Sequence, residues 1–222
     1  IPSVSNEDRR ASYLDLARVM ALLHAADPAA VGLETFGRPG NYYERQIGRW
    51  SKQYLASQTE ELPNMHKLME WLPNNIPAEA GSVIVHGDYR LGNVLIHPTE
   101  PKIVAVLDWE LSTLGDGLAD LGYLCQDYHG DAYDDEGLAG ADFATLNLPT
   151  EAEFLAEYCK HAGRDGIETP RHRTGTIPLC KGCTRHSAHP PRCAPARPAS
   201  SGAAARRSAP PRPTAPATAT RR

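Results

Sequence analysis

The composition of this 222-residue chain changes abruptly after Thr169, and the change limits how much of the chain can fold. Residues 1–169 hold all 27 acidic residues and 12 of the 23 basic ones, a net charge of −15, whereas residues 170–222 hold 11 basic residues and no acidic one. The second segment also has 10 of the 19 prolines, no aromatic residue, and only Ile177 and Leu179 as large aliphatic residues. Such a segment cannot bury enough apolar surface to offset the entropy lost on ordering it. We therefore predict a folded body, residues 1–169, and a disordered Pro/Ala/Arg-rich basic tail, residues 170–222.

Several classes of protein are excluded by the apolar runs, the cysteines and the charge. No run of 18 apolar residues exists and no secretory signal precedes the body, so we expect neither a membrane span nor secretion. Only Cys125 and Cys159 of the five cysteines lie in the body, which fits a reducing compartment better than a disulfide framework. An acidic body also lacks the electrostatic footprint of a nucleic-acid binder. We expect a cytoplasmic protein, and, because Ile1 is not a methionine, a piece of a longer one.

Apolar periodicity predicts a mainly helical body with a small β patch. Residues three and four apart in sequence are apolar in five segments, which predict helices at 6–26, 43–54, 65–72, 118–126 and 150–161. Asn6 is the expected cap of the first helix, and Thr150 with Glu153 forms a capping-box pattern at the last. Short runs rich in β-branched residues predict strands at Val83–Val85, Val94–Ile96 and Ile103–Leu107. Helices, strands and helices again constitute an α+β arrangement.

The segment HGDYRLGN, residues 86–93, lies between the first two predicted strands, and Asp108 follows the third. In protein kinases a loop of the form H-x-D-x4-N supplies an Asp that accepts the proton of the attacking hydroxyl and an Asn that holds a metal ion, and a later Asp binds Mg²⁺. Asp88 and Asn93 have that spacing, and a hairpin between Asn93 and Asp108 would return Asp108 to the loop. Carboxylate and amide oxygens suit Mg²⁺, so Asn93 and Asp108 are the expected ligands.

The same segment, together with LDWE at 107–110 and GDGLADL at 115–121, resembles the aminoglycoside phosphotransferase/choline kinase family. RPGNY at 38–42 and QIGRW at 46–50 resemble in particular the kinase-like domain fused to certain acyl-CoA dehydrogenases. The resemblance implies a protein-kinase-like fold, of which the body would be the mainly helical, large C-terminal lobe with a small β-hairpin patch. The family usually has proline where Gly117 stands.

The resemblance also implies an activity and the roles of single residues. It implies an ATP-dependent phosphotransferase acting on a hydroxyl of a small metabolite, hydroxyacyl-CoA-like or aminoglycoside-like, with an acyl-CoA dehydrogenase as the protein partner that it suggests. By this resemblance Asp88 is the catalytic base, and Asn93 and Asp108 bind Mg²⁺ and, through it, the nucleotide. His86, Asp116 and Asp120 give structural support. The N-terminal lobe, with its Gly-rich loop and strand lysine, would precede Ile1, so we expect this chain to be inactive alone.

Alternatives remain for both segments. The body could be a metal-dependent hydrolase in which His86 is a metal ligand and no nucleotide is needed, or a non-catalytic, pseudokinase-like binding protein that kept the loop but lost turnover. The tail has zinc-ligand residue types in Cys180, Cys183, His186, His189 and Cys193, and its charge allows a nucleic-acid arm. We favour a third interpretation of the tail, translation out of frame after about Glu168, because acidic and aromatic residues disappear together.

Overall fold

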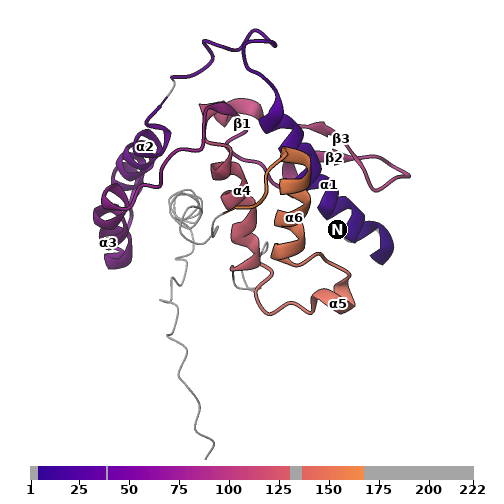
Figure 1. Cartoon of the computed structure of the whole chain (residues 1–222). Coiled ribbons are helices and arrows are strands. Elements are labelled where there is room, and N and C mark those ends of the chain that lie inside the picture. The colour runs from indigo at the N-terminus through magenta and orange to yellow at the C-terminus, as the bar shows by residue number, and fades with distance from the viewer. Residues whose placement is uncertain (1–4, 39, 131–136, 168–222) are drawn as a thin grey trace, which may run out of the picture. The chain divides into compact units, whose positions relative to one another are not determined.

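The computed structural model describes residues 5–38, 40–130 and 137–167 of the chain (Figure 1). Contacts within the chain divide it after residue 191, and every described residue lies in the first of the two units. The predicted boundary at residue 169, the basic tail and the candidate zinc ligands therefore lie outside the described residues. Within the described residues, no helix is long and apolar enough to cross a membrane.

The helices confirm the predicted pattern, with small differences at their ends. Their bounds are α1 Asn6–Ala25, α2 Tyr42–Ser57, α3 Pro63–Trp71, α4 Leu118–Cys125, α5 Phe143–Leu146 and α6 Glu151–Ala162, with 3-10 turns η1 Leu72–Asn74, η2 Leu91–Asn93, η3 Trp109–Leu111 and η4 Gln126–Tyr128. The predicted cap of α1 is wrong: Ser5 caps it, its hydroxyl accepting from the Asp8 N–H at 3.1 Å. The capping box of Thr150 and Glu153 is present at α6. The sequence pattern does not predict α5, because four residues are too few to show a helical period.

The strands form two separate antiparallel pairs. β2 (Val94–Ile96) pairs with β3 (Ile103–Val106) as the predicted hairpin, whereas β1 (Val83–Val85) pairs with β4 (Thr113–Gly115). The register of the second pair sets Val83 opposite Gly115 and Val85 opposite Thr113. β4 is absent from the prediction because its three residues carry no alternating apolar pattern. The β1–β4 pair brings the start of the 86–93 loop beside the segment that ends at Asp116.

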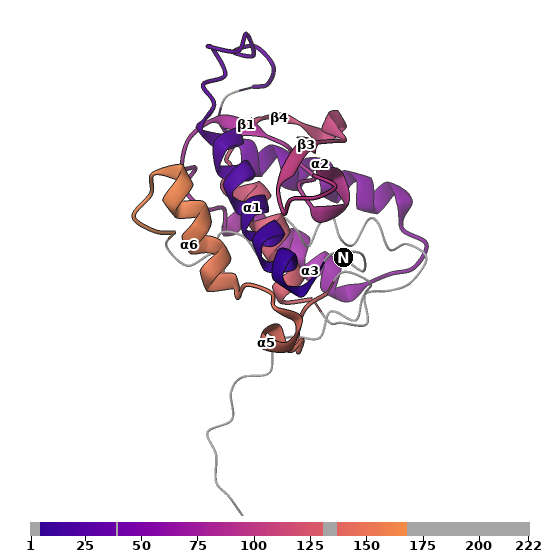
Figure 2. The ribbon, with the colours of Figure 1, turned by 90° about the vertical axis from the view of Figure 1, so that its right-hand side faces the viewer.

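The main core lies between α1, α4 and α6. α1 and α6 lie side by side, as both views show (Figures 1 and 2), and Leu16 and Met20 of α1 share a buried cluster with Leu121, Phe154 and Tyr158. All five side chains are almost completely buried. Burial of a large aliphatic or aromatic side chain stabilises a fold by about 1.5–3 kcal/mol, so this cluster fixes α4 and the residues at its N-terminus against α1 and α6.

α2 is attached to the rest of the body at its N-terminal end. Tyr42 and Tyr43 pack with Val85 of β1 and Ala119 of α4. The Tyr42 ring lies so close to Gly115 that a Cβ there would be 2.2 Å from it, so only glycine allows this contact. Further along α2, buried residues pack against α3 and η1 in two smaller clusters, which contain Ile47, Trp50 and Leu72 in one and Tyr54 and Met65 in the other.

Candidate active site

The backbone of the 86–93 loop is held by a buried carboxylate from α4. Asp120 is 1% exposed, and its two oxygens accept the N–H groups of His86 at 2.6 Å and Gly87 at 2.8 Å. A buried N–H without an acceptor costs about 1–3 kcal/mol, so a carboxylate at this position determines where the loop begins.

His86 is completely buried and both nitrogens of its ring are hydrogen-bonded. Its Nδ1 accepts the Asp88 N–H at 3.2 Å, so its Nε2 carries the proton and donates to the Leu107 carbonyl at 2.8 Å. The Trp109 ring covers it, with the two centroids 4.8 Å apart. This imidazole joins the loop to the segment that holds Asp108, and neither nitrogen is open to a metal ion.

Gly87 makes a backbone turn that other residues would strain. Its φ is +84°, and a Cβ there would lie 2.5 Å from the Leu111 carbonyl oxygen. Asp88 directly follows this turn near the beginning of the loop and has only 3% of its surface exposed. The guanidinium Nε of Arg90 lies 3.7 Å from Asp88 Oδ2, so a positive charge stands beside that carboxyl.

Asn93 is oriented by Asp88. The side-chain amide of Asn93 donates to the Asp88 carbonyl and to Asp88 Oδ2, both at 2.9 Å. Because these bonds use the nitrogen of the amide, its oxygen is the atom that remains for a cation. The two residues named as base and ligand are thus in direct contact.

Asp108 is held beside Asn93 through its neighbour Leu107. The Leu107 N–H donates to the Asn93 carbonyl at 2.8 Å, and the Leu107 carbonyl accepts from His86. Asp108 itself is exposed and has φ 64° and ψ 61°, the left-handed conformation that Asp tolerates better than most residues. A left-handed residue costs about 1–3 kcal/mol and is typical of functional sites. Asp88 and Asn93 of the loop and Asp108 of the segment after β3 are therefore brought together by these hydrogen bonds.

Asp116 lies apart from this cluster and holds the backbone on either side of the β4–α4 turn. Its carboxylate oxygens accept the Ala80 N–H at 2.8 Å and the Leu118 N–H at 2.9 Å. Like Asp120 it is 1% exposed and acts on the backbone.

Two residues that sequence reasoning missed, His24 and Tyr158, support Asp120. His24 Nε2 lies 3.4 Å from Asp120 Oδ2, and its Nδ1 lies 2.9 Å from the Tyr158 hydroxyl. A carboxylate only accepts, so Nε2–H donates to Asp120 and Nδ1 accepts from Tyr158. Burial raises the pKa of Tyr158 to about 12, which keeps the hydroxyl a donor. The signal in the sequence was a histidine on the apolar face of the first helix, which alone does not reveal a partner 96 residues away.

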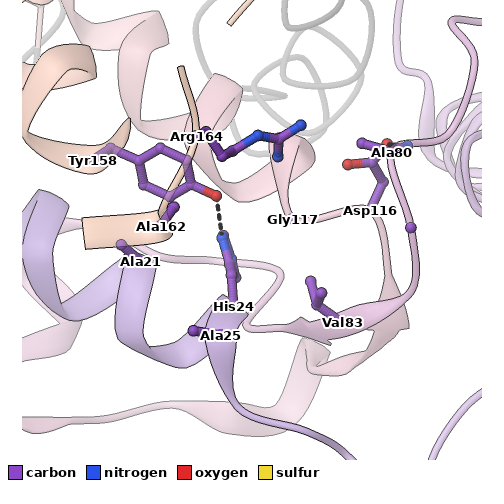
Figure 3. Close-up of a pocket in the computed structure, with 11 residues that line it drawn as sticks. Ala21, His24, Ala25, Ala80, Val83, Asp116, Gly117, Tyr158, Ala162 and Arg164 are labelled. Carbon is purple, nitrogen blue, oxygen red and sulfur yellow. Dashed lines mark hydrogen bonds between the residues drawn. The ribbon is translucent and has the colours of Figure 1, made fainter. Parts of the chain in front are cut away.

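A cavity of about 180 Å³ lies beside His24 and Tyr158 (Figure 3). Alanines and glycines line much of it, and its polar groups come from these two residues, Asp116 and Arg164. Arg164 extends from the end of α6 toward the side of the cavity where Asp116 lies (Figure 3). Asp88, Asn93 and Asp108 do not line the cavity, so it is separate from the polar cluster of the loop.

The donor set of the cluster suits a hard divalent cation. An amide oxygen and a carboxylate are oxygen ligands of the kind that Mg²⁺ prefers when the remaining ligands are water and phosphate. Within the described residues, no group of three or more His, Cys, Asp and Glu side chains could hold a metal ion.

Comparisons with known proteins agree with this geometry. The model of the family described as "Phosphotransferase enzyme family" matches residues 2–167. Among curated proteins, Arabidopsis thaliana IBR3, named as an acyl-CoA dehydrogenase, is 44% identical over 74% of this chain, and Mus musculus acyl-CoA dehydrogenase family member 10 is 38% identical over 76%. The chain spans only 21% and 16% of these two relatives.

Solved structures give the same result. A Ralstonia eutropha protein named after aminoglycoside phosphotransferases has a TM-score of 0.77 and 43% identity, over 84% of this chain and 57% of its own. The aminoglycoside-3'-phosphotransferase of type VIII, 22% identical over 80% of this chain and 62% of its own, has a TM-score of 0.59 and shows a shared fold.

Proposed function

Because the chain belongs to the phosphotransferase enzyme family, we propose that its 86–93 loop transfers a phosphoryl group from ATP to a hydroxyl of a small metabolite. We further propose that the body is the C-terminal lobe of a kinase-like enzyme. The curated relatives are named acyl-CoA dehydrogenases, which favours a hydroxylated acyl-CoA-like substrate over an aminoglycoside and makes such a dehydrogenase the candidate partner.

In the proposed mechanism the oxygen of the substrate hydroxyl attacks the γ-phosphorus of ATP in line, and Asp88 accepts the hydroxyl proton. The bond between the γ-phosphorus and the β-phosphate oxygen breaks, and ADP leaves. Arg90 places a positive charge beside the Asp88 carboxyl, and Asn93 holds that carboxyl in place through the bond to Oδ2. Asn93 Oδ1 and the Asp108 carboxylate would hold Mg²⁺, which neutralises charge on the phosphates when bound. Asp120, through His86 and Gly87, sets the position of the loop.

One observation carries the proposal: the contact between Asp88 and Asn93 with Asp108 held next to them through Leu107. These groups come from segments up to 20 residues apart, and each has the chemistry that its proposed role requires. A turn formed only for structural reasons would not need an exposed carboxylate in a left-handed conformation at Asp108.

The hydrolase alternative requires His86 as a metal ligand, and the hydrogen bonds of both ring nitrogens argue against that role. The binding-protein alternative differs from our proposal in turnover only, so an assay of phosphoryl transfer distinguishes the two.

For the isolated chain we propose weak nucleotide binding and no turnover. Lys102 pairs with Glu100 and Lys160 with Glu157, so neither is placed to orient phosphates. A nucleotide held mainly through Mg²⁺ should bind with a Kd of about 1 mM or weaker.

The test compares two aspartates in one assay. The chain would be joined to the N-terminal part of the Ralstonia eutropha relative and assayed with MgATP on hydroxyacyl-CoA and aminoglycoside panels. Asp88→Asn should lower turnover by a factor of about 10³ or more with nucleotide binding retained, because it removes only the proton acceptor. Asp108→Ala should abolish Mg²⁺-dependent nucleotide binding, measured by calorimetry. Full turnover in both variants would contradict the assignment.

A further inference from the structure

One face of α2 carries three cations in a row. Arg45, Arg49 and Lys52 have the i, i+4, i+7 spacing that places side chains on one face of a helix, and we call them the α2 basic stripe. Arg49 and Lys52 are exposed and Arg45 is half-buried. The other residues on this face near the stripe, Asn41 and Gly48, are uncharged.

Within the described residues, no ion pair joins the stripe to a carboxylate. Arg45 donates to the backbone carbonyls of Arg38 and Gly40, and the Arg49 guanidinium lies 5.4 Å from the ring centroid of Trp50. Five basic side chains elsewhere lie within ion-pair distance of a carboxylate: Arg10 with Glu153, Arg18 with Asp15, Arg90 with Asp88, Lys102 with Glu100, and Lys160 with Glu157. The ion pairs among the described residues do not include Arg9, Arg38, Lys67 or Arg164. In a body with 27 acidic and 12 basic residues, like charges at helical spacing destabilise the helix, and the contacts of Arg45 and Arg49 are with carbonyls and a ring rather than with a carboxylate.

The stripe begins one helical turn after Tyr42, which packs against the segments next to the loop. Tyr42, one turn before Arg45, packs on Gly115, and its cluster includes Val85, the residue before His86. Burial and the charges of Asp120 and Asp116 raise the pKa of the Tyr42 phenol, and the charges of Arg45 and Arg49 oppose that rise. The same phenol is therefore near both the aspartates that hold the loop and the stripe. From Arg45 the stripe extends about 10 Å along the helix.

The chemistry of the stripe fits phosphate groups. A guanidinium binds a phosphate through two parallel hydrogen bonds, and an ammonium adds a compact charge. Arg45 is already fixed by its two carbonyl contacts, so less side-chain entropy is lost on binding. Three cations over this length suit a ligand with more than one phosphate. The same field would repel an aminoglycoside, which carries several ammonium groups.

We propose that the α2 basic stripe binds the diphosphate and phosphomonoester groups of a coenzyme A substrate, whose hydroxylated acyl end lies at Asp88. This inference rests on the proposed function and names its substrate class. The phosphates do not react, but their binding energy holds the hydroxyl near the base and so contributes to catalysis. The stripe thereby selects anionic acyl-CoA substrates against polycationic ones.

Gly48 offers a sharp test because it lies on the same face as the stripe and has open space. Among the described residues no heavy atom lies within 4 Å of a Cβ built there, and glycine is a poor helix former, so both Gly48→Ala and Gly48→Glu should keep or raise the melting temperature. Only Gly48→Glu adds a carboxylate between Arg45 and Lys52. Calorimetric titration of the full chain with coenzyme A should give a Kd that is about tenfold or more weaker in Gly48→Glu and within about twofold of the parent in Gly48→Ala.

Other ligands and variants complete the test. Pantetheine, which has no phosphate, should not bind, and kanamycin should not compete with coenzyme A. The double variant Arg49→Gln/Lys52→Gln should lose coenzyme A binding, whereas Lys67→Gln/Lys102→Gln, with the same change of net charge, should keep it. Equal coenzyme A affinity in Gly48→Glu and Gly48→Ala, no binding by the parent, or displacement by ATP at equal affinity would overturn the assignment.

The experiments distinguish a failure of the proposed phosphotransferase function from a failure of this inference about the α2 basic stripe. Asp88→Asn should leave the coenzyme A Kd unchanged, because Asp88 belongs to the loop and not to the stripe. A stripe that binds coenzyme A in a protein whose turnover does not depend on Asp88 would refute the mechanism alone. Turnover that depends on Asp88, with coenzyme A affinity insensitive to the stripe, would refute this inference alone.

Discussion

Removal of the Asp120 carboxylate should destabilise the whole body, because it is the acceptor for two buried N–H groups. Asp120→Ala would leave the His86 and Gly87 donors, now bonded at 2.6 and 2.8 Å, without their acceptor in a site closed to water. It would also leave His24 Nε2 without its partner, but that contact is 3.4 Å long and contributes less. The loss falls on the segment that carries Asp88.

The size of the effect follows from these contacts. A hydrogen bond to a charged group contributes about 1.5–3 kcal/mol, so two of them correspond to a loss of about 3–6 kcal/mol in the free energy of unfolding. In a domain of this size each kcal/mol lowers the melting temperature by about 2–4 °C. We therefore expect a decrease of at least about 6 °C for Asp120→Ala. Asp120→Asn keeps one side-chain oxygen as acceptor and should lose about half as much.

Thermal and urea unfolding followed by circular dichroism would measure these differences. Asp142→Ala is the matched control, because Asp142 accepts the Thr145 N–H at 3.1 Å on the surface, where water can replace it. That variant should lose no more than about 1 kcal/mol, a typical helix-cap effect. Equal losses in Asp120→Ala and Asp142→Ala would show that the loop N–H groups have other acceptors and would refute the reasoning.

Two further predictions concern contacts that only the folded chain makes. A Cβ at Gly117 would lie 2.7 Å from His24 Nδ1, so Gly117→Ala should lower the free energy of unfolding by about 1–3 kcal/mol. In a His24→Ala background the same substitution should cost clearly less. Additive costs in the double variant would show that the two residues are not in contact. The side-chain hydrogen bond from Arg10, followed by the N–H and hydroxyl of Thr150, lowers the pKa of Glu153 from 4.5 to about 2. A lowered carboxyl pKa stabilises the folded state above pH 4.5, and that contribution is lost as the pH falls toward 2. In Glu153→Gln the urea midpoint of unfolding should therefore depend less on pH across this range than it does in the parent. The same pH dependence in both proteins would contradict the assignment.

Much of the candidate site was predictable because its residues are close in sequence or joined by one hairpin. Asp88 and Asn93 are five residues apart in a loop between short strands, and the β2–β3 hairpin returns the chain to Asn93 at Leu107. The helices were predictable for a related reason, since a buried face repeats every three to four residues. Gly87 has a positive φ, which glycine adopts more readily than other residues, but the sequence analysis did not predict this conformation.

The sequence by itself determined most of the local elements and which residues are candidates for the site, because both depend on neighbouring residues. The tertiary structure alone decided what holds those groups: β1 pairs with β4 rather than with the hairpin, Asp120 receives the loop N–H groups from 34 and 33 residues away, and His24 links it to Tyr158, 134 residues from His24. It also decided that Arg45, Arg49 and Lys52 have no carboxylate partner among the described residues. Such partners are chosen by packing in three dimensions, where any of 27 carboxylates could have been the acceptor, and no spacing rule in the chain selects among them.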